Sequence, residues 1–575
     1  MDGDHQGRCI YTTCADGYLT ANFEYLTDRV VMTDGLGQRH EYGFNDLYLM
    51  AWEKSPFGHL TRYEYDDVGN LLREISPAGR AVEFAYLGDS GLVSTFTDGS
   101  GHAWHYAYDD HERLIGITDP LGRRWVWQYD NNGNPLSLTG PDASEVRFAW
   151  NRYGLLTEVS DQNGHVQASL FYDHRQRLLS ATDAEARTQQ LRYDSQDRLT
   201  SWTRPDGATY RLGYRRASWG LPEQLIRPDE KEEKRQYDKH NNLLNYTDGN
   251  GAVWQQTYGP FDLLMSRTDA EGRTWQYDYD KDSQQLIGVT APDGNRWQWW
   301  LDADGRVIRE RDMAGTETHY GYDEDGHCIS VRNGEGEIRH FLYDGRGLLI
   351  KETAPDDTLY YRYDAAGRLT QQDNTHYQYD KAGRLIRRQV VQPGYRPQVW
   401  HYRWDSRNQL RVVDTPTGER WLYRYDPFGR RIGKRCDQTQ DDIRYLWDGD
   451  QIAEVRHSRD NQRFSRRHWV HNGWELLVQQ RQNADKSWET DFVTSGHNGE
   501  PQAVFNPQGE LRWQAPRANL WGQRYTENAE KYDPGLAFAG QYRDDESGLC
   551  YNRFRYYDPS GGCYISPDPI GVAGG

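Results

Sequence analysis

The sequence has few cysteines, no long apolar run and fewer basic than acidic residues. Its six cysteines are scattered over 575 residues, too sparsely for the disulfide framework of a small secreted domain, so we expect folding in a reducing compartment. No apolar run approaches the roughly 20 residues of a membrane-spanning helix, which excludes a protein of that class. The first residues have neither the basic nor the apolar region of a secretory signal, so this stretch is not expected to direct export.

The charge balance is acidic, with 68 Lys and Arg against 87 Asp and Glu and a net charge of -19. Because binding to a phosphate backbone needs a basic face, this balance speaks against nucleic acid as a partner. A Gly-Lys-Ser/Thr loop for nucleotide phosphates does not occur. His468 and His471 lack a neighbouring cysteine or acidic residue at the spacing of a zinc site, so we expect neither a metal nor a cofactor.

Hydrophobic residues are also scarce, at 36% of the chain, yet 13% of all residues are aromatic. Disordered chains share the low hydropathy but are poor in aromatics. The 41 tyrosines, 21 tryptophans and 56 glycines are instead typical of many short strands that are joined by tight turns.

A phrase of the form Tyr-Asp-x-x-Gly-x-Leu recurs along the chain, for example from Tyr65 to Leu71 and from Tyr363 to Leu369. Its aromatic anchor returns about every 21 residues between Phe23 and Trp447, a period that indicates a repeat architecture. Each repeat predicts two strands and two turns, because Asp, Pro and Gly suit tight turns. The strand before each anchor alternates aromatic and other residues, which is a strand period and not a helical one.

The constant period predicts an all-β fold in which equivalent rings stack from repeat to repeat. Strand twist prevents a flat sheet of this length, so the ribbon must coil into a large, hollow β-spiral. A wall one sheet thick is wetted on both faces, which accounts for the low hydropathy. We assign residues 23–450 to this shell, residues 1–22 to a segment that leads into it, and residues 451–540, where the repeat fades, to an irregular β region.

The Tyr-Asp repeats resemble those of Rhs proteins, also called YD-repeat proteins, whose relatives include the C component of Tc toxins and the teneurins. The end of the chain carries the most specific likeness: GLCYNRFRYYDP from Gly548 to Pro559 and ISPDPIG from Ile565 to Gly571 match the end of the Rhs core. The resemblance implies a β-cocoon that encloses a C-terminal toxin for competition between bacteria. Residues 541–575 would be its core-associated plug, here truncated, which acts as an intramolecular aspartic protease that frees the toxin.

Aspartic proteolysis needs two carboxylates close enough to share a proton. Matched to the family, Asp568 is the first catalytic aspartate, and Arg555 is an essential arginine that orients the acidic site or stabilises developing charge. The second family carboxylate would lie beyond Gly575. Asp558 is a further candidate, although its Asp-Pro setting is also typical of a turn. The alternative for Arg555 and Asp568 is a structural ion pair that seals the plug.

Two residues depart from the family pattern: Cys563 stands where an arginine is usual, and Val572 stands where a leucine is usual. Both substitutions leave the predicted catalytic groups in place, but they indicate a relaxed constraint on cleavage.

The partner that the resemblance implies is the protein's own C-terminal toxin domain, which is not in this chain. By analogy with type VI secretion, spike components and a chaperone would be further partners, and the protein would pass from the bacterial cytoplasm to the outside or the cell surface. The main alternative is a secreted or cell-surface protein whose aromatic ladders bind carbohydrate. Packing between repeats would use the same aromatic residues.

Overall fold

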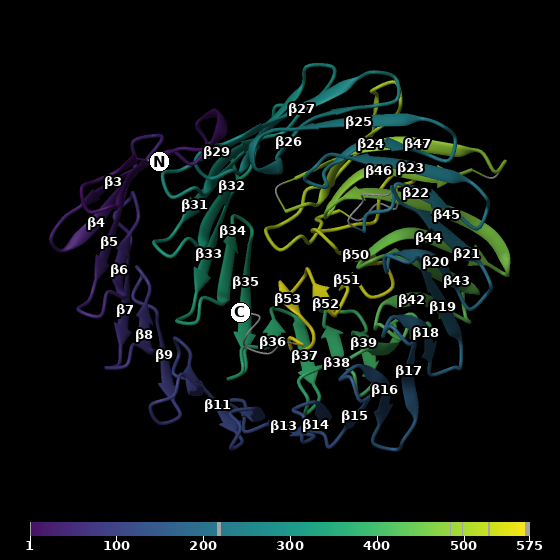
Figure 1. The fold of residues 1–575 in the computed structure, drawn as a ribbon, viewed down its shortest axis with the longest axis horizontal. Helices are drawn as coiled ribbons and strands as arrows, with labels where there is room; N and C mark the ends of the chain where they lie inside the picture. Colours follow the sequence, from purple (N-terminus) through teal and green to yellow (C-terminus); the bar gives the residue numbers. More distant parts are fainter. Residues whose placement is uncertain (1, 216–219, 484, 497, 527–529, 570–575) are drawn as a thin grey trace. The chain divides into compact units, whose positions relative to one another are not determined.

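The computed structural model describes residues 2–569, except 216–219, 484, 497 and 527–529. Within these ranges the chain forms 53 strands and two short 3-10 helices, Ala15–Gly17 and Pro260–Asp262, and no α-helix (Figure 1). The predicted all-β class is confirmed.

The chain divides into two compact units, and each unit combines stretches that are far apart in the sequence. Unit 1 consists of Met1–Gly122, Gln255–Thr268 and Gly272–Gly367, and unit 2 consists of Arg123–Trp254, Asp269–Glu271 and Arg368–Gly575.

Within the repeats, each strand pairs antiparallel with the strand that follows it. In unit 1, β7 (Leu60–Tyr65) pairs with β8 (Leu71–Ile75), and β8 pairs with β9 (Ala81–Tyr86). The turn from β7 to β8 begins at Asp66, whose Oδ1 accepts hydrogen bonds from the amides of Val68 at 3.0 Å and Asn70 at 2.8 Å. Gly69 closes the turn with φ +93°. This geometry confirms the predicted Asp-x-x-Gly turn.

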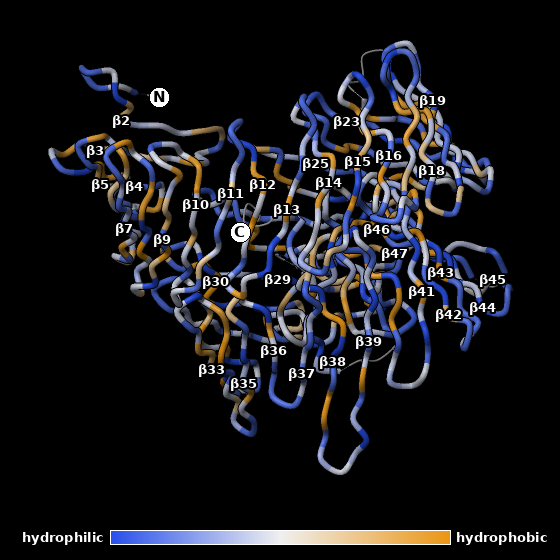
Figure 2. The backbone as a smooth tube through the Cα atoms, turned by 90° about the horizontal axis from the view of Figure 1, so that it is seen from below, coloured by the Kyte–Doolittle hydropathy of each residue, from blue (hydrophilic) through white to orange (hydrophobic). Residues whose placement is uncertain are grey.

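The wall exposes both of its faces. None of the six residues of β7 is fully buried, and the same holds for β9. Hydrophobic residues lie along the strands, whereas the turns are mostly hydrophilic (Figure 2). In these repeats of unit 1 the low hydropathy therefore reflects a thin sheet with water on both sides, whereas strands of unit 2 such as β41 (Arg420–Tyr425) bury alternate residues.

The anchor side chains bind the preceding repeat through their polar tips. The hydroxyl of Tyr65 donates to the carbonyl of Met50 at 2.7 Å, and that of Tyr86 donates to the carbonyl of Leu71 at 2.6 Å. The same hydrogen bond, to a carbonyl 14 to 16 residues earlier, recurs at Tyr108, Trp150, Tyr172, Tyr193, Tyr214, Tyr279, Tyr343, Tyr363 and Tyr425. The repeats are thus joined at their anchors by hydrogen bonds.

Ring contacts run between neighbouring strands. Phe84 on β9 lies 5.4 Å from Phe96 on β10 (Val93–Thr97), and Phe96 lies 5.7 Å from Trp104 on β11 (Ala103–Tyr108), measured between ring centroids. We expected equivalent anchors to stack on one another. The structure instead joins rings across adjacent strands, because strands within a sheet are only about 4.8 Å apart, whereas equivalent anchors are separated by an intervening strand.

In each unit, segments more than 230 residues apart lie side by side. In unit 1, Asp282 accepts a hydrogen bond from the amide of Gly35 at 3.1 Å, 247 residues away. Asp304 accepts one from Ser55 Oγ at 3.0 Å, and Asp325 accepts one from the amide of Ala78 at 2.8 Å. Each of these aspartates is the third residue after an anchor. The regular advance of these contacts along both segments shows that the ribbon coils back on itself.

Unit 2 contains the same kind of contact. Arg384 Nη2 lies 2.7 Å from Asp142 Oδ2, 242 residues earlier, and Gln480 Nε2 donates to Asp248 Oδ2 at 3.1 Å, 232 residues earlier. Polar side chains of turns, and in unit 2 also of strand β46 (Glu475–Gln482), therefore connect successive coils, as a β-spiral requires.

Strand pairing continues beyond the last Tyr-Asp phrase. The strands concerned are β44 (Gln451–Arg459), β45 (Gln462–Asn472), β46 (Glu475–Gln482), β47 (Trp488–Ser495), β48 (Pro501–Phe505) and β49 (Leu511–Gln514). In the region predicted as irregular, each strand pairs with the next as far as Gln514, with a register shift in four of these five pairings. Buried apolar residues at its centre, such as Leu476 and Val478, replace the repeat phrase as the source of register.

A separate four-stranded sheet follows near the C-terminus. It consists of β50 (Tyr542–Asp544), β51 (Leu549–Asn552), β52 (Arg555–Asp558) and β53 (Cys563–Tyr564), paired antiparallel in this order. These strands lie within the predicted plug, and we call them the plug sheet.

Replacing Tyr86 by Phe tests the anchor hydrogen bond. The ring stays, but the carbonyl of Leu71 loses its donor, so we expect the free energy of unfolding to fall by about 1 kcal/mol. Urea denaturation monitored by fluorescence measures this change. Tyr48→Phe is the control, because Tyr48 is 89% exposed; an equal loss in both variants would contradict the role of the anchor hydroxyl.

Candidate functional site

The plug sheet has two faces with different surroundings. Strand alternation and the register Tyr542–Tyr551–Tyr556 place these three tyrosines on one side, together with Asp544 and Asp558. We call this side the wall face, because its residues contact the repeat strands of unit 2. The other side, the free face, carries Asn552, Arg555, Tyr557 and Tyr564, which are paired as Asn552–Arg555 and Tyr557–Tyr564.

Buried charges join the plug sheet and its following turn to β42 (Arg431–Cys436). Both terminal nitrogens of Arg431 bind the carboxylate of Asp544, at 2.6 and 2.8 Å. Lys434 Nζ lies 2.8 Å from Asp544 and 2.8 Å from Glu546. All four side chains are at most 3% exposed. We call these four residues the plug lock.

Aromatic rings complete the surroundings of Arg431. Five ring centroids lie 4.5 to 5.7 Å from its guanidinium carbon, those of Tyr423, Tyr445, Tyr542, Tyr551 and Tyr556. Burial disfavours the charged guanidinium, but the carboxylate of Asp544 together with Tyr445 and Tyr556 outweighs burial and holds the pKa of Arg431 well above its ordinary value. The residue therefore stays charged, and its charge is satisfied by groups of the plug.

The sequence contains a signal for the plug lock that the repeat analysis missed. Arg431 stands where the repeat phrase carries leucine, and the leucines at this position in two other repeats, Leu369 and Leu385, are fully buried. A charge at a buried position needs a partner. The partner could not be identified from the sequence, because Asp544 lies 113 residues away.

Asp558 lies on the wall face and is fully buried. Its Oδ2 accepts a hydrogen bond from the hydroxyl of Tyr377 at 3.0 Å and lies 3.7 Å from Arg388 Nη1, and its Oδ1 accepts one from the amide of Ser560 at 3.0 Å. These contacts are typical of a carboxylate that shapes a turn. They favour the turn interpretation of this candidate.

The turn that follows Asp558 packs closely on the wall. A Cβ atom at Gly561 would lie 2.7 Å from Leu369 Cδ2, too close for any other residue without a shift. Leu369 belongs to β36 (Leu369–Gln372), which forms a short hairpin with β37 (Thr375–Tyr379). The backbone amide of Leu385 also donates to the carbonyl of Ile565 at 2.9 Å. The segment that leads to Asp568 is thus seated on the repeats of unit 2.

Arg555 and Asp568, the two residues matched to the family's catalytic pair, lie in contact. Arg555 Nη2 is 2.9 Å from Asp568 Oδ2, and the side chains are 23% and 20% exposed. The guanidinium can orient the carboxylate in this arrangement. A structural ion pair would have the same geometry, so the catalytic role stays a prediction.

Of the two residues that depart from the family pattern, the structure describes Cys563 but not Val572. Cys563 pairs with Asp558 in the sheet, and burial raises the pKa of its thiol above the ordinary value. Val572 lies outside the described residues, which end at Pro569.

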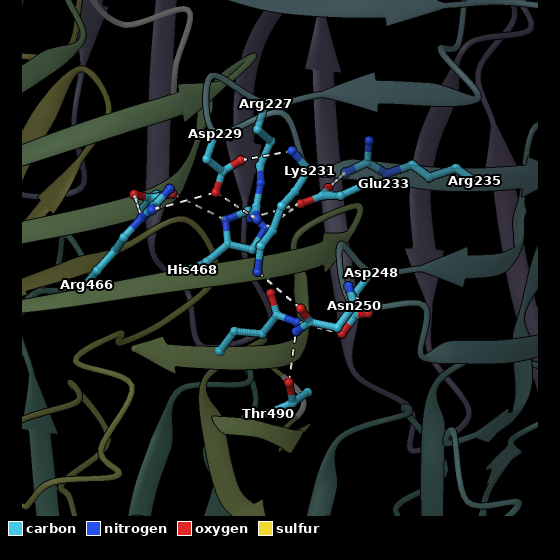
Figure 3. A network of polar contacts seen from close by, with 12 residues as sticks. Arg227, Asp229, Lys231, Glu233, Arg235, Asp248, Asn250, Arg466, His468 and Thr490 are labelled. Atoms are coloured by element: carbon cyan, nitrogen blue, oxygen red, sulfur yellow. Dashed lines mark hydrogen bonds and ion pairs between the residues drawn. The ribbon is translucent and has the colours of Figure 1, made fainter. Parts of the chain in front are cut away.

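His468 lies in a second charged cluster, which joins two coils of unit 2 (Figure 3). It is 6% exposed and belongs to β45. Its Nε2 is 3.6 Å from Oε1 of Glu233, on β23 (Glu232–Tyr237), and its Nδ1 is 4.0 Å from Oε2 of Glu454. Arg227 pairs with the carboxylate of Glu233, and Arg466 pairs with that of Glu454. Among the residues that the structure describes, no group of His, Cys, Asp and Glu could hold a metal ion.

Two family models match the chain. The Teneurin YD-shell model matches residues 309–572, and the RHS Repeat model matches residues 89–120, 108–145, 237–274 and 260–296. The proteins called probable deoxyribonuclease RhsB and probable deoxyribonuclease RhsA of Dickeya dadantii (strain 3937) are 58% and 57% identical to the chain over its whole length.

The chain belongs to the Rhs family of YD-repeat proteins. It spans 54% of the length of each of these two Rhs relatives. Double-stranded DNA deaminase toxin A of Burkholderia cenocepacia (strain H111) is 25% identical over 98% of the chain, which covers 44% of that protein.

The fold is also that of a known Rhs-type shell. The Tc holotoxin pore of Photorhabdus luminescens, with a mutation in its TccC3 component, matches 99% of the chain at 16% identity and a TM-score of 0.67. The chain covers 32% of that structure. A TcdB2-TccC3 crystal structure matches the whole chain at 15% identity and a TM-score of 0.54, and the chain covers 33% of it. The described residues contain no helix that is long and apolar enough to span a membrane.

Replacing Asp544 by Asn tests the plug lock. Arg431 and Lys434 would keep their buried positive charges but lose one of the two carboxylates that compensate them. We therefore expect the plug to lose about 3–5 kcal/mol of stability. Limited proteolysis after Gln514 and chemical denaturation measure this loss. The neighbouring Asp545 is exposed, so Asp545→Asn should behave like the wild type. Equal resistance of the two variants would argue against the plug lock.

The pKa of His468 predicts a loss of stability in acid. Burial lowers this pKa, and Glu233 and Glu454 oppose that effect only in part. The unfolded chain, with a histidine pKa of about 6.5, therefore takes up a proton before the folded protein does. Stability falls as the pH drops below about 6.5, by up to about 1.4 kcal/mol per pH unit.

Denaturation curves at pH 7.5 and 5.5 check this expectation. His468→Gln should lose less stability than the wild type between the two values, whereas a variant of the exposed His174 should not differ from the wild type. Burial raises the pKa of Asp491 to about 6, so this residue increases the stability as the pH falls. Because Asp491 is present in every variant, its contribution cancels when the variants are compared. The same acid loss in His468→Gln and the wild type would show that His468 is not the titrating group.

Proposed function

We propose that the chain is the shell segment of a polymorphic bacterial toxin, which encloses a C-terminal toxin domain and takes part in its autoproteolytic release. The observation that carries this proposal is the plug sheet. Its wall face is locked to the repeats by buried charges, while its free face presents Arg555 in contact with Asp568.

The names of the relatives support a carrier role. The two Dickeya proteins and the Burkholderia protein align over at least 98% of this chain, yet their names give different activities, deoxyribonuclease in one case and DNA deaminase in the other. A shared segment with different activities favours a toxic domain outside that segment. Nucleic acid would then be a substrate of the toxin domain, and the acidic shell itself would not bind it.

Release would proceed by hydrolysis of a peptide bond. The oxygen of a water molecule bonds to the carbonyl carbon, the bond from carbon to nitrogen breaks, and the leaving nitrogen takes up a proton. Asp568 would accept the proton of the attacking water, with its carboxylate oriented by Arg555. A second carboxyl group from a segment beyond this chain would supply the proton to the nitrogen.

The protein would be held in the bacterial cytoplasm before export and would act outside the cell. Type VI spike components and a chaperone are its proposed partners. Carbohydrate binding by the anchor tyrosines is less well supported, because their hydroxyls donate to the backbone of the preceding repeat and are not free for a sugar.

Self-cleavage of the full-length protein tests this function. We expect Asp568→Asn to abolish cleavage and Arg555→Ala to slow it at least about 100-fold, because the attacking water loses its base or the base loses its orientation. Gel analysis of the purified protein over time measures both. Asp545→Asn is the control, and normal cleavage in both site variants would refute the assignment.

A further inference from the structure

An aromatic ring supports Arg555 on the free face of the plug sheet. The guanidinium carbon of Arg555 lies 3.7 Å from the ring centroid of Tyr564, while its Nη2 binds Asp568 at 2.9 Å. We propose that Tyr564, held in place by Asn552, is the positioning residue that fixes the guanidinium of Arg555 against the carboxylate of Asp568. This inference rests on the proposed autoproteolysis.

The register of the sheet brings the three side chains together. Asn552 is paired with Arg555, and Tyr564 is paired with Tyr557, two residues after Arg555. Side chains at positions i and i+2 of a strand lie on one face, and diagonal neighbours across a strand pair are within reach of long side chains. Tyr564 is such a diagonal neighbour of Arg555.

The ring of Tyr564 is itself fixed from two sides. Asn552 Nδ2 donates a hydrogen bond to the Tyr564 hydroxyl at 2.8 Å. The ring of Tyr557 meets that of Tyr564 edge-on, with centroids 5.5 Å apart. Tyr557 in turn donates from its hydroxyl to the carbonyl of Trp521 at 2.8 Å. The support beneath Arg555 is therefore part of a connected set of contacts.

Arg555 needs such a support more than Arg431 does. Arg431 is fully buried and binds both oxygens of its carboxylate partner, whereas the side chains of Arg555 and Asp568 are 23% and 20% exposed, so water competes for their ion pair. An arginine in this position has many rotamers available in water. Stacking on an aromatic face restricts the guanidinium to one plane, and a displacement of about 1 Å from the productive geometry can cost about 100-fold in rate.

The same hairpin offers a matched control. Arg553 lies over the ring of Phe554 at 4.2 Å, but its guanidinium binds Asp450 and the carbonyl of Phe428. Phe554→Leu therefore removes a ring beneath a neighbouring arginine that does not contact Asp568.

The experiment measures the rate of self-cleavage of the full-length protein carrying single substitutions. We expect Tyr564→Leu to slow cleavage at least about 10-fold. Tyr564→Phe keeps the ring and should stay within about 3-fold of the wild type, while Phe554→Leu should be unchanged. Asn552→Ala removes the same hydrogen bond as Tyr564→Phe and keeps the ring, so it should also stay within about 3-fold of the wild type. A higher cleavage rate in Tyr564→Phe than in Tyr564→Leu distinguishes support by the aromatic ring from a general loss of packing.

The outcomes distinguish this inference from the function on which it rests. If Arg555→Ala and Asp568→Asn cleave normally, the proposed autoproteolysis fails. If those two variants are inactive while Tyr564→Leu cleaves at the wild-type rate, only the role of Tyr564 is overturned. Equal slowing by Tyr564→Leu and Tyr564→Phe would also overturn it, because the ring would then not be the active element.

Discussion

The recurring hydrogen bond from tyrosine and tryptophan anchors to a backbone carbonyl 14 to 16 residues earlier is the interaction on which the wall depends. A sheet that is wetted on both faces has no second layer to hold its strands in place. Tyrosine and tryptophan combine a large apolar body with a hydrogen-bond donor at the far end. One such side chain can therefore cover the sheet and also bind the backbone of the preceding repeat. Phenylalanine lacks that donor, so an anchor such as Phe44 cannot make this bond, and tyrosine is favoured at the position.

In unit 1 the connection between coils depends on a different position of the same turn. Asp282, Asp304 and Asp325 contact the turns of another coil, whereas Val68, at the equivalent place in an earlier repeat, is 63% exposed. The turn geometry is set by the first aspartate and the glycine, so the third residue is free to serve the contact. A change at this third position alone therefore allows the same turn either to contact another coil or to face solvent.

The sequence was sufficient to predict the strands and the turns, because both follow from local residue preferences repeated many times. The contacts of the site could not be predicted in this way. Arg431 and Asp544 are 113 residues apart, and His468 meets Glu233 only because the ribbon coils. The contact of Arg555 with Asp568 was expected from the family match and not from the spacing of the residues. The pairing from Gln451 to Gln514 follows no recurring phrase of the sequence, and buried apolar residues such as Leu476 and Val478 lie along it instead.

The two faces of the plug sheet differ by a single step along β52, where Arg555 and Tyr557 point one way and Tyr556 and Asp558 point the other. Insertion or deletion of one residue between Asn552 and Asp558 would exchange these sides, bringing the charged arginine into the tyrosine pocket and removing one of the pocket's own tyrosines from it. The length of this hairpin is therefore constrained by the two different surroundings that its alternating side chains must reach.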